Sequence, residues 1–182
     1  MTTVRMIYDW LDGWAPFAAA MSFDNAGLLA GSGEESVSAA LLALDITPAV
    51  VEEAKEGGAQ LIVSHHPVIF DPLRRLVPGS APYLLCEAGI AAICAHTNLD
   101  LAPGGVNTCL AERLGLSRVR PLSLDGPSGL PESLCGELPS PLSPEAFARH
   151  VKKALGCEAV EFTPGAGEIR TVGLCSGAGA FC

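Results

Sequence analysis

The segment AALLALDITPAVVEEAKEGGAQLIVSHH, residues 39–66, decides the fold of this chain. Residues 39–46 are almost all apolar and predict a strand, and residues 60–64 predict a second one. Between them, Thr47 and Pro48 are residue types preferred at the start of a helix, and a pair of glycines ends it. The segment therefore predicts a β-α-β unit, which places two parallel strands in one sheet.

The same alternation extends on both sides of this unit. Further elements are expected as helices over residues 3–11, 80–88, 107–114 (with Asn107 as N-cap) and 144–155, and as strands within residues 22–31, 90–95 and 168–182. The pattern indicates the α/β class, with a largely parallel or mixed sheet covered by helices on both faces. We expect three regions: an α/β lobe over residues 1–116, a proline-rich connector over residues 117–144, and the start of a second lobe over residues 145–182.

Composition excludes several classes of protein. The chain has 182 residues, of which 49% are apolar and 17% charged, as in a globular domain rather than a disordered one. A net charge of −9 disfavours a nucleic-acid surface, and the apolar runs are too short to cross a bilayer. The amino terminus lacks the apolar core of a signal peptide. Seven cysteines without a CxxC predict buried thiols in a reducing cytoplasm rather than disulfides or a zinc site.

Three of the four histidines lie at the ends of predicted strands. His65 and His66 follow the second strand directly, and His96 follows the third, with Asp100 four residues later. The carboxyl ends of parallel strands are where ligands and catalytic groups gather in open α/β sheets. Imidazole and carboxylate are ligands for borderline or hard divalent cations, so this pattern predicts a metal site.

The arrangement of these ligands stays open at the level of sequence. Neighbouring residues on a strand point to opposite faces, but Pro67 forces the chain to turn directly after the histidine pair. The two imidazoles can then reach different metals of a pair or flank a single one. His96 and Asp100 share one side if this segment is helical, and not if it is extended.

Other polar residues have competing interpretations. Asp24 and Asn25 fit ordinary turn chemistry, and Asp45 is equally a partner of the metal site or a polar strand end. His150 lies in a predicted helix and is expected to be a solvated surface residue.

A nucleophile is less well supported than a metal. Ser64 precedes His65 but no GxSxG motif surrounds it. Cys94 lies on an apolar strand, which predicts a buried and inert thiol. No phosphate-binding or dinucleotide-binding glycine motif is present in the sequence.

Three motifs together resemble one known family. They are FDNAGLLAG (23–31), ALDITPAVVEEAKEGGAQLIVSHHPVIF (43–70) and AICAHTNLDLAPGGVNTCLAERLGL (92–116). They resemble the dinuclear-metal proteins called GTP cyclohydrolase I type 2 homologues, or NGG-interacting-factor-like proteins. GELPSPLSPEAFARHVKKALG and VGLCSGAGAF fit the same pattern, so the resemblance covers almost the whole chain.

This resemblance implies two similar α/β lobes and a homohexameric ring with pairs of metal ions in its interior. It implies two divalent ions per complete chain, with zinc, iron, manganese and magnesium all open. By the positions that match, the metal ligands are His65, His66 and Asp100, and the residues that line the site are His96, Asp24 and Asn25. The resemblance assigns no catalytic residue here and no substrate.

The sequence departs from the family at its carboxyl end. The family completes its metal pair with a histidine and a glutamate after a GGSGA-like strand, and neither has a counterpart before Cys182. We therefore expect a fragment, in which the second lobe is incomplete. The expected function is a cytoplasmic metal-dependent hydrolase acting through a metal-bound hydroxide. The alternative is a non-enzymatic ring that binds partners and uses its metal only structurally.

Overall fold

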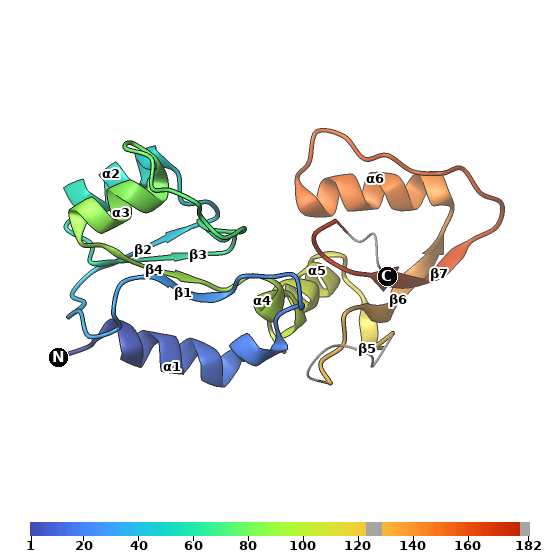
Figure 1. Cartoon of the computed structure of the whole chain (residues 1–182). Coiled ribbons are helices and arrows are strands. Elements are labelled where there is room, and N and C mark those ends of the chain that lie inside the picture. The colour runs from blue at the N-terminus through green and yellow to red at the C-terminus, as the bar shows by residue number, and fades with distance from the viewer. Residues whose placement is uncertain (123–128, 179–182) are drawn as a thin grey trace. The chain divides into compact units, whose positions relative to one another are not determined.

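The structure is a computed structural model that describes residues 1–122 and 129–178. It contains two compact units, Met1–Leu99 and Asp100–Cys182, which are described separately below (Figure 1). The expected end of the last motif, residues 179–181, and Cys182 lie outside the described residues. The regions expected from the sequence, 1–116, 117–144 and 145–182, stay a prediction.

The first unit is built on a four-stranded mixed sheet in the order β1-β4-β3-β2. The strands are β1 (Gly27–Ala30), β2 (Ala40–Ala43), β3 (Leu61–Ser64) and β4 (Ala91–Cys94). β2, β3 and β4 run parallel, as the β-α-β pattern predicted, whereas β1 is antiparallel to β4. The mixed form of the expected sheet is therefore the one observed.

Helices cover both faces of this sheet (Figure 1). They are α1 (Val4–Trp14), the short 3₁₀ helix η1 (Phe17–Ala19), α2 (Pro48–Glu56) and α3 (Ala81–Ala88), and α4 (Thr97–Leu101) follows β4. One face packs against α1 through Val4 and Leu11, and the opposite face packs against α2 and α3 through Val51 and Leu85. No described helix has the length and apolar character needed to cross a membrane.

Local sequence explains where α2 begins. Thr47 adopts an extended backbone and its hydroxyl accepts a hydrogen bond from the backbone N–H of Val50 at 3.3 Å. Pro48 then occupies the first turn, where no N–H is needed. Both expected roles are confirmed.

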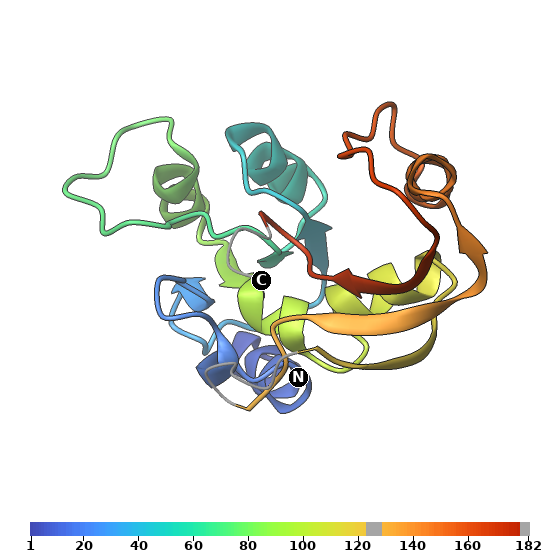
Figure 2. The same cartoon turned by 90° about the vertical axis from the view of Figure 1, so that its right-hand side faces the viewer.

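The register of the parallel strands aligns their carboxyl ends. It places in line the last residue of each strand, Ala43, Ser64 and Cys94. The pairing continues past β3, because the backbone N–H of His66 donates to the carbonyl of Leu44 at 2.9 Å. Figure 2 shows the long loop that then leads to α3.

The second unit contains a three-stranded antiparallel sheet in the order β5-β6-β7. Its elements are α5 (Val106–Arg113), β5 (Ser117–Pro121), β6 (Leu134–Leu142), α6 (Pro144–Leu155) and β7 (Ile169–Leu174). The helices pack on the sheet through an apolar cluster that includes Leu114, Val151 and Leu174. β5 and β6 both lie within the expected connector, so its described part contains two strands.

Two expectations in this unit were wrong. Gly105, not Asn107, caps α5; Asn107 is buried inside the helix, where its amide donates to the Glu132 carbonyl and accepts from the Ser176 N–H. His150 is half-buried rather than solvated, because its Nε2 is hydrogen-bonded to the Leu114 carbonyl at 2.9 Å.

Candidate metal centre

Three imidazoles meet at the carboxyl ends of β3 and β4. The ring centroids of His65 and His66 lie 5.1 Å apart, those of His65 and His96 5.2 Å, and those of His66 and His96 5.7 Å. One ring nitrogen of each residue lies within 4.8 Å of the others. The turn after β3 thus brings both histidines to one side, although neighbouring residues within a strand would point to opposite faces.

Each of the three rings has its Nδ1 bound to an oxygen. Nδ1 of His65 lies 2.9 Å from the Ala95 carbonyl, Nδ1 of His66 2.7 Å from Asp45 Oδ1, and Nδ1 of His96 2.9 Å from Asp24 Oδ1. A carbonyl or a carboxylate can only accept, so Nδ1 carries the proton in every ring. In the neutral imidazole, Nε2 then carries the lone pair, and it is the atom through which such a ring binds a metal.

Asp24 holds His96 from a fully buried position, since its side chain is 0% exposed. Its carboxylate accepts four hydrogen bonds, from His96 Nδ1, the Asn25 N–H, the Thr97 N–H and the Thr97 hydroxyl. Burial alone would raise the pKa of Asp24, but the Thr97 hydroxyl, His96 and the Thr97 N–H outweigh it and lower that pKa. Asp24 is therefore an ionised carboxylate at neutral pH.

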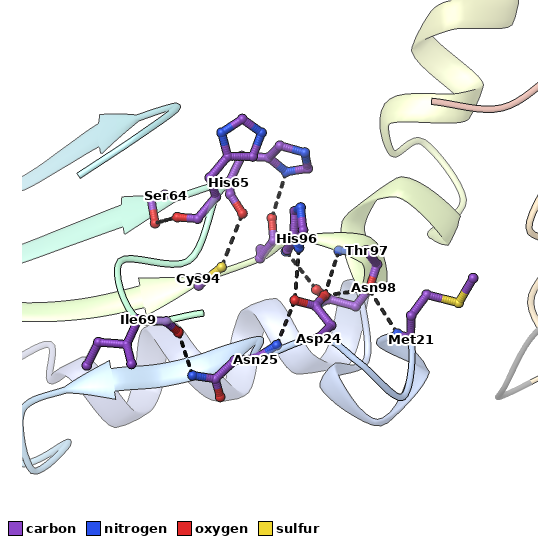
Figure 3. Close-up of polar contacts among 12 residues, drawn as sticks. Met21, Asp24, Asn25, Ser64, His65, Ile69, Cys94, His96, Thr97 and Asn98 are labelled. Carbon is purple, nitrogen blue, oxygen red and sulfur yellow. Dashed lines mark hydrogen bonds and ion pairs between the residues drawn. The ribbon is translucent and has the colours of Figure 1, made fainter. Parts of the chain in front are cut away.

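The Thr97-Asn98 dipeptide organises the backbone around His96 (Figure 3). The Thr97 hydroxyl donates to Asp24 at 2.5 Å and accepts from the Met21 N–H at 2.9 Å. Asn98 is fully buried; its oxygen accepts from the His96 N–H at 2.9 Å and its nitrogen donates to the Ala15 carbonyl at 2.6 Å. Thr97 thus fixes the carboxylate that contacts His96, and Asn98 fixes the backbone of His96 itself.

Ser64 and Cys94 hold the backbone of the histidine pair. The Ser64 hydroxyl donates to the His66 carbonyl at 2.9 Å, and the Cys94 thiol donates to the His65 carbonyl at 3.1 Å. Burial, followed by the charge of Asp24 and against a hydrogen bond with Ser64, raises the pKa of Cys94 to about 12. The expected burial of the Cys94 thiol is confirmed, and the two side chains hold the turn after β3.

The remaining expected residues lie in different places. Asn25 points away from the imidazoles, because its amide donates to the Ile69 carbonyl at 2.6 Å and so holds the loop after β3. Asp100 lies in α4, so the helical of the two alternatives holds for residues 97–101; it is the first residue of the second unit. The sequence left open whether Asp45 is a partner of the site, and the structure shows it hydrogen-bonded to His66. The contact depends on the register of β2 against β3, which spacing in the sequence does not give.

The sequence matches the DUF34/NIF3 (NGG1p interacting factor 3) family over residues 2–182. The chain belongs to this family. It is 34% identical over 176 residues to a GTP cyclohydrolase 1 type 2 homolog of Halalkalibacterium halodurans, covering 94% of this chain and 44% of that protein. A homologue of the same name from Staphylococcus aureus is 44% identical over 112 residues, covering 60% of this chain and 31% of its own length. The chain thus spans less than half the length of these DUF34/NIF3 relatives.

Solved structures show the same fold. A hypothetical protein of Staphylococcus aureus superposes with a TM-score of 0.90 at 28% identity, covering 98% of this chain and 73% of that one. Reduced HcgD from Methanocaldococcus jannaschii gives a TM-score of 0.71 at 29% identity, covering 84% of this chain and 60% of its own. The expected family and the expected fold class are both confirmed.

The donor set fits a metal ion on chemical grounds. Three imidazoles with protonated Nδ1 atoms present three neutral nitrogen donors, which suit zinc, iron, copper or nickel better than magnesium or calcium. A carboxylate or carbonyl behind each metal-ligating histidine is the usual arrangement in metalloproteins. A metal site at this His65, His66 and His96 group is therefore chemically reasonable.

Proposed function

We propose that His65, His66 and His96 bind a divalent transition-metal ion through Nε2. Two observations carry the proposal. All three Nδ1 atoms have an oxygen partner, which makes Nε2 the metal-binding nitrogen of each ring, and one ring nitrogen of each residue lies within 4.8 Å of the others. The proposal promotes His96 from a residue that lines the site to a ligand. Nitrogen donors favour zinc or iron over manganese or magnesium.

We propose that Asp100 contributes to a second ion. The family resemblance assigns Asp100 to the metal pair, and carboxylate oxygens are common ligands of divalent cations. Two ions per complete chain then require ligands additional to the imidazoles of the first unit. Asp24 and Asn25 take no metal in this proposal, since one is saturated by four donors and the other holds the loop at Ile69.

The proposed reaction class is hydrolysis. A bound divalent ion would act as a Lewis acid and lower the pKa of water toward neutrality, which is the chemistry that a hydrolase needs. The chain's own contribution is orientation: Asp24 and Asp45 keep the proton on Nδ1 of their histidines, and Ser64 and Cys94 fix the turn. The relatives are named for GTP cyclohydrolase, whereas no group described here selects a guanine base.

The experiment is metal content per chain, by elemental analysis of the purified protein and of a variant with both His65→Ala and His66→Ala. The matched control is His150→Ala, which removes the fourth histidine outside the group. We expect at least about one transition-metal ion per chain in the unchanged protein and in the control, and almost none in the double variant. Equal metal content in all three folded proteins would contradict the proposal.

The second candidate is a ring-forming interaction protein whose metal is structural. Its support is the name of the family, NGG1p interacting factor 3. Turnover of a substrate that disappears with His65→Ala favours the hydrolase; a metal-loaded and catalytically silent hexamer, identified by light scattering, favours the interaction protein. We place either in the cytoplasm, because all six described cysteines are free thiols.

A further inference from the structure

Two carboxylate–histidine pairs flank the imidazole group, and they differ in exposure. In the inner pair, Asp24 and His96, the side chains are 0% and 19% exposed. In the outer pair, Asp45 and His66, they are 57% and 45% exposed. The hydrogen bonds are of similar length, 2.9 Å and 2.7 Å, so the difference is in access to solvent rather than in geometry.

The sheet itself produces the outer pair. β2 is an edge strand of the sheet, and its register against β3 aligns Ala43 with Ser64. Asp45 and His66 each lie two residues beyond these positions, and the backbone bond from His66 to Leu44 keeps the two chains together there. The register of β2 against β3 therefore places Asp45 beside His66.

The rings are held to different degrees. His96 is fixed by a saturated carboxylate, and its backbone is fixed by the buried amide of Asn98. The backbone of His66 is fixed by hydrogen bonds with Leu44 and Ser64. Its ring, by contrast, is exposed, and the hydrogen bond from Nδ1 to Asp45 orients it. Without that bond, the ring of an exposed histidine rotates, and its proton exchanges between Nδ1 and Nε2.

We propose that Asp45 is a positioning residue for His66, and that the outer pair is the side of the site through which the metal enters and leaves. This inference rests on the proposed metal site. Asp45 would keep Nε2 of His66 aimed at the metal, and loss of this bond would open the ligand set on its solvent side. Removal of a carboxylate behind a metal-ligating histidine costs about 10–100-fold in metal affinity.

The first test is zinc affinity and release in the full chain, measured by competition with a chromophoric chelator. We expect Asp45→Ala to raise the zinc Kd about 10–100-fold, mainly through faster release. Asp45→Asn retains an oxygen acceptor, so its zinc Kd is expected to lie between those of the unchanged protein and Asp45→Ala. The matched control is Asp71→Ala, which removes one exposed carboxylate from the same unit and is expected to leave zinc binding unchanged.

The second test is the proton position in the metal-free protein, read from long-range ¹H–¹⁵N spectra of the imidazoles. We expect His66 to carry its proton on Nδ1 in the unchanged protein and to become a mixture in Asp45→Ala, while His96 keeps its Nδ1 proton. The urea midpoint of the metal-free variant should not move, because the outer pair is exposed. This separates positioning from a role in folding.

The two tests distinguish a failure of the metal site from a failure of the role of Asp45. Failure of the unchanged protein to bind zinc would overturn the metal site and the inference together. Normal zinc binding by the unchanged protein, with neither zinc release nor the His66 tautomer altered in Asp45→Ala, would overturn the inference alone.

Discussion

At the scale of single residues, Asp24 shows how the buried part of the site is stabilised. A carboxylate without solvent exposure is costly to bury unless its oxygens are satisfied, and four donors satisfy them here. The same four donors lower its pKa against the effect of burial. Asp24 therefore stabilises the fold and orients His96 with one group, whereas Asp45 orients His66 from an exposed position.

Replacement of Asp24 by alanine leaves His96 Nδ1–H and two groups of Thr97 without their acceptor in a buried site. Because the cost of breaking a buried charged network is high, we expect a loss of about 3 kcal/mol in the free energy of unfolding. Urea denaturation of the metal-free protein measures it, with Asp45→Ala as the exposed control. A loss no larger than that of the control would show that the network does not stabilise the fold.

Thiol reactivity is a second prediction at this scale. The pKa of Cys94 is raised to about 12 by burial, so its thiolate is almost absent near pH 8. Cys86 and Cys109 are exposed. Brief treatment of the native protein with iodoacetamide, followed by peptide mass spectrometry, should label these two and leave Cys94 unlabelled until urea is added. Native labelling of Cys94 at the rate of Cys86 would contradict the structure.

At the scale of elements, α1 and the segment between β4 and α4 are joined by one side chain. Asn98 reaches the carbonyl of Ala15, which caps α1, and it also accepts the N–H of His96. The Asn98 side chain is fully buried, and so is its contact with Ala15, whereas its contact with His96 is partly buried. A buried polar group that loses its partner has little access to replacement by water. The connection explains why an amide, with one donor and one acceptor, follows His-Thr here.

Asn98→Ala should therefore destabilise the first unit by about 2–4 kcal/mol, because the buried Ala15 carbonyl and the partly buried His96 N–H lose their partners. Asn98→Asp retains the acceptor for His96 but loses the donor for Ala15, and it adds a buried charge, so it should not restore stability. Denaturation curves of both variants test this. A rescue by aspartate would show that only the contact with His96 matters.

The loop between β1 and β2 provides a pH-dependent contact. The Glu35 carboxylate accepts hydrogen bonds from the N–H and the hydroxyl of Ser32 and from the N–H of Gly33. The backbone carbonyls of Gly33 and Glu35 in turn accept hydrogen bonds from N–H groups in the first turn of α1. The backbone hydrogen bond from Ser32 is the largest cause that holds the pKa of Glu35 below its ordinary value of 4.5, against a smaller effect of burial.

A lowered pKa in the folded state means that the unfolded state binds the proton more readily. The contribution of Glu35 is thus complete above pH 4.5 and is lost as the pH falls from there through the folded-state pKa. Glu35→Gln should lose stability at pH 7, by less than about 1 kcal/mol for so accessible a group, and should show a shallower decline below pH 4.5 than the unchanged protein. Parallel declines would contradict this account of Glu35.

At the scale of the whole molecule, the three imidazoles all belong to the first unit, and Asp100 opens the second. The chain covers 44% of its Halalkalibacterium relative, so a complete dinuclear site and its reaction are proposals for the whole protein. His65, His66 and His96 all lie within this chain, so metal binding by these three imidazoles can be measured on the chain by itself.

Much of this organisation was predictable from the sequence. Apolar runs that end in His65 and His96 predicted parallel strands with ligands at their carboxyl ends, because hydrophobic periodicity determines which elements form. The register of β2 against β3 and the antiparallel addition of β1 depend on tertiary packing, so the partners of His66 and His96 could not be read from spacing. The same limit explains Asn107, whose burial against Glu132 overrode its preference for a cap.

The central claim is that three imidazoles bind one transition-metal ion through Nε2. X-ray absorption spectroscopy of the zinc-loaded chain tests it directly. We expect about three imidazole nitrogens at about 2.0–2.1 Å from zinc, falling to two in His96→Ala. A spectrum with one imidazole or none, or with sulfur at about 2.3 Å, would contradict the account.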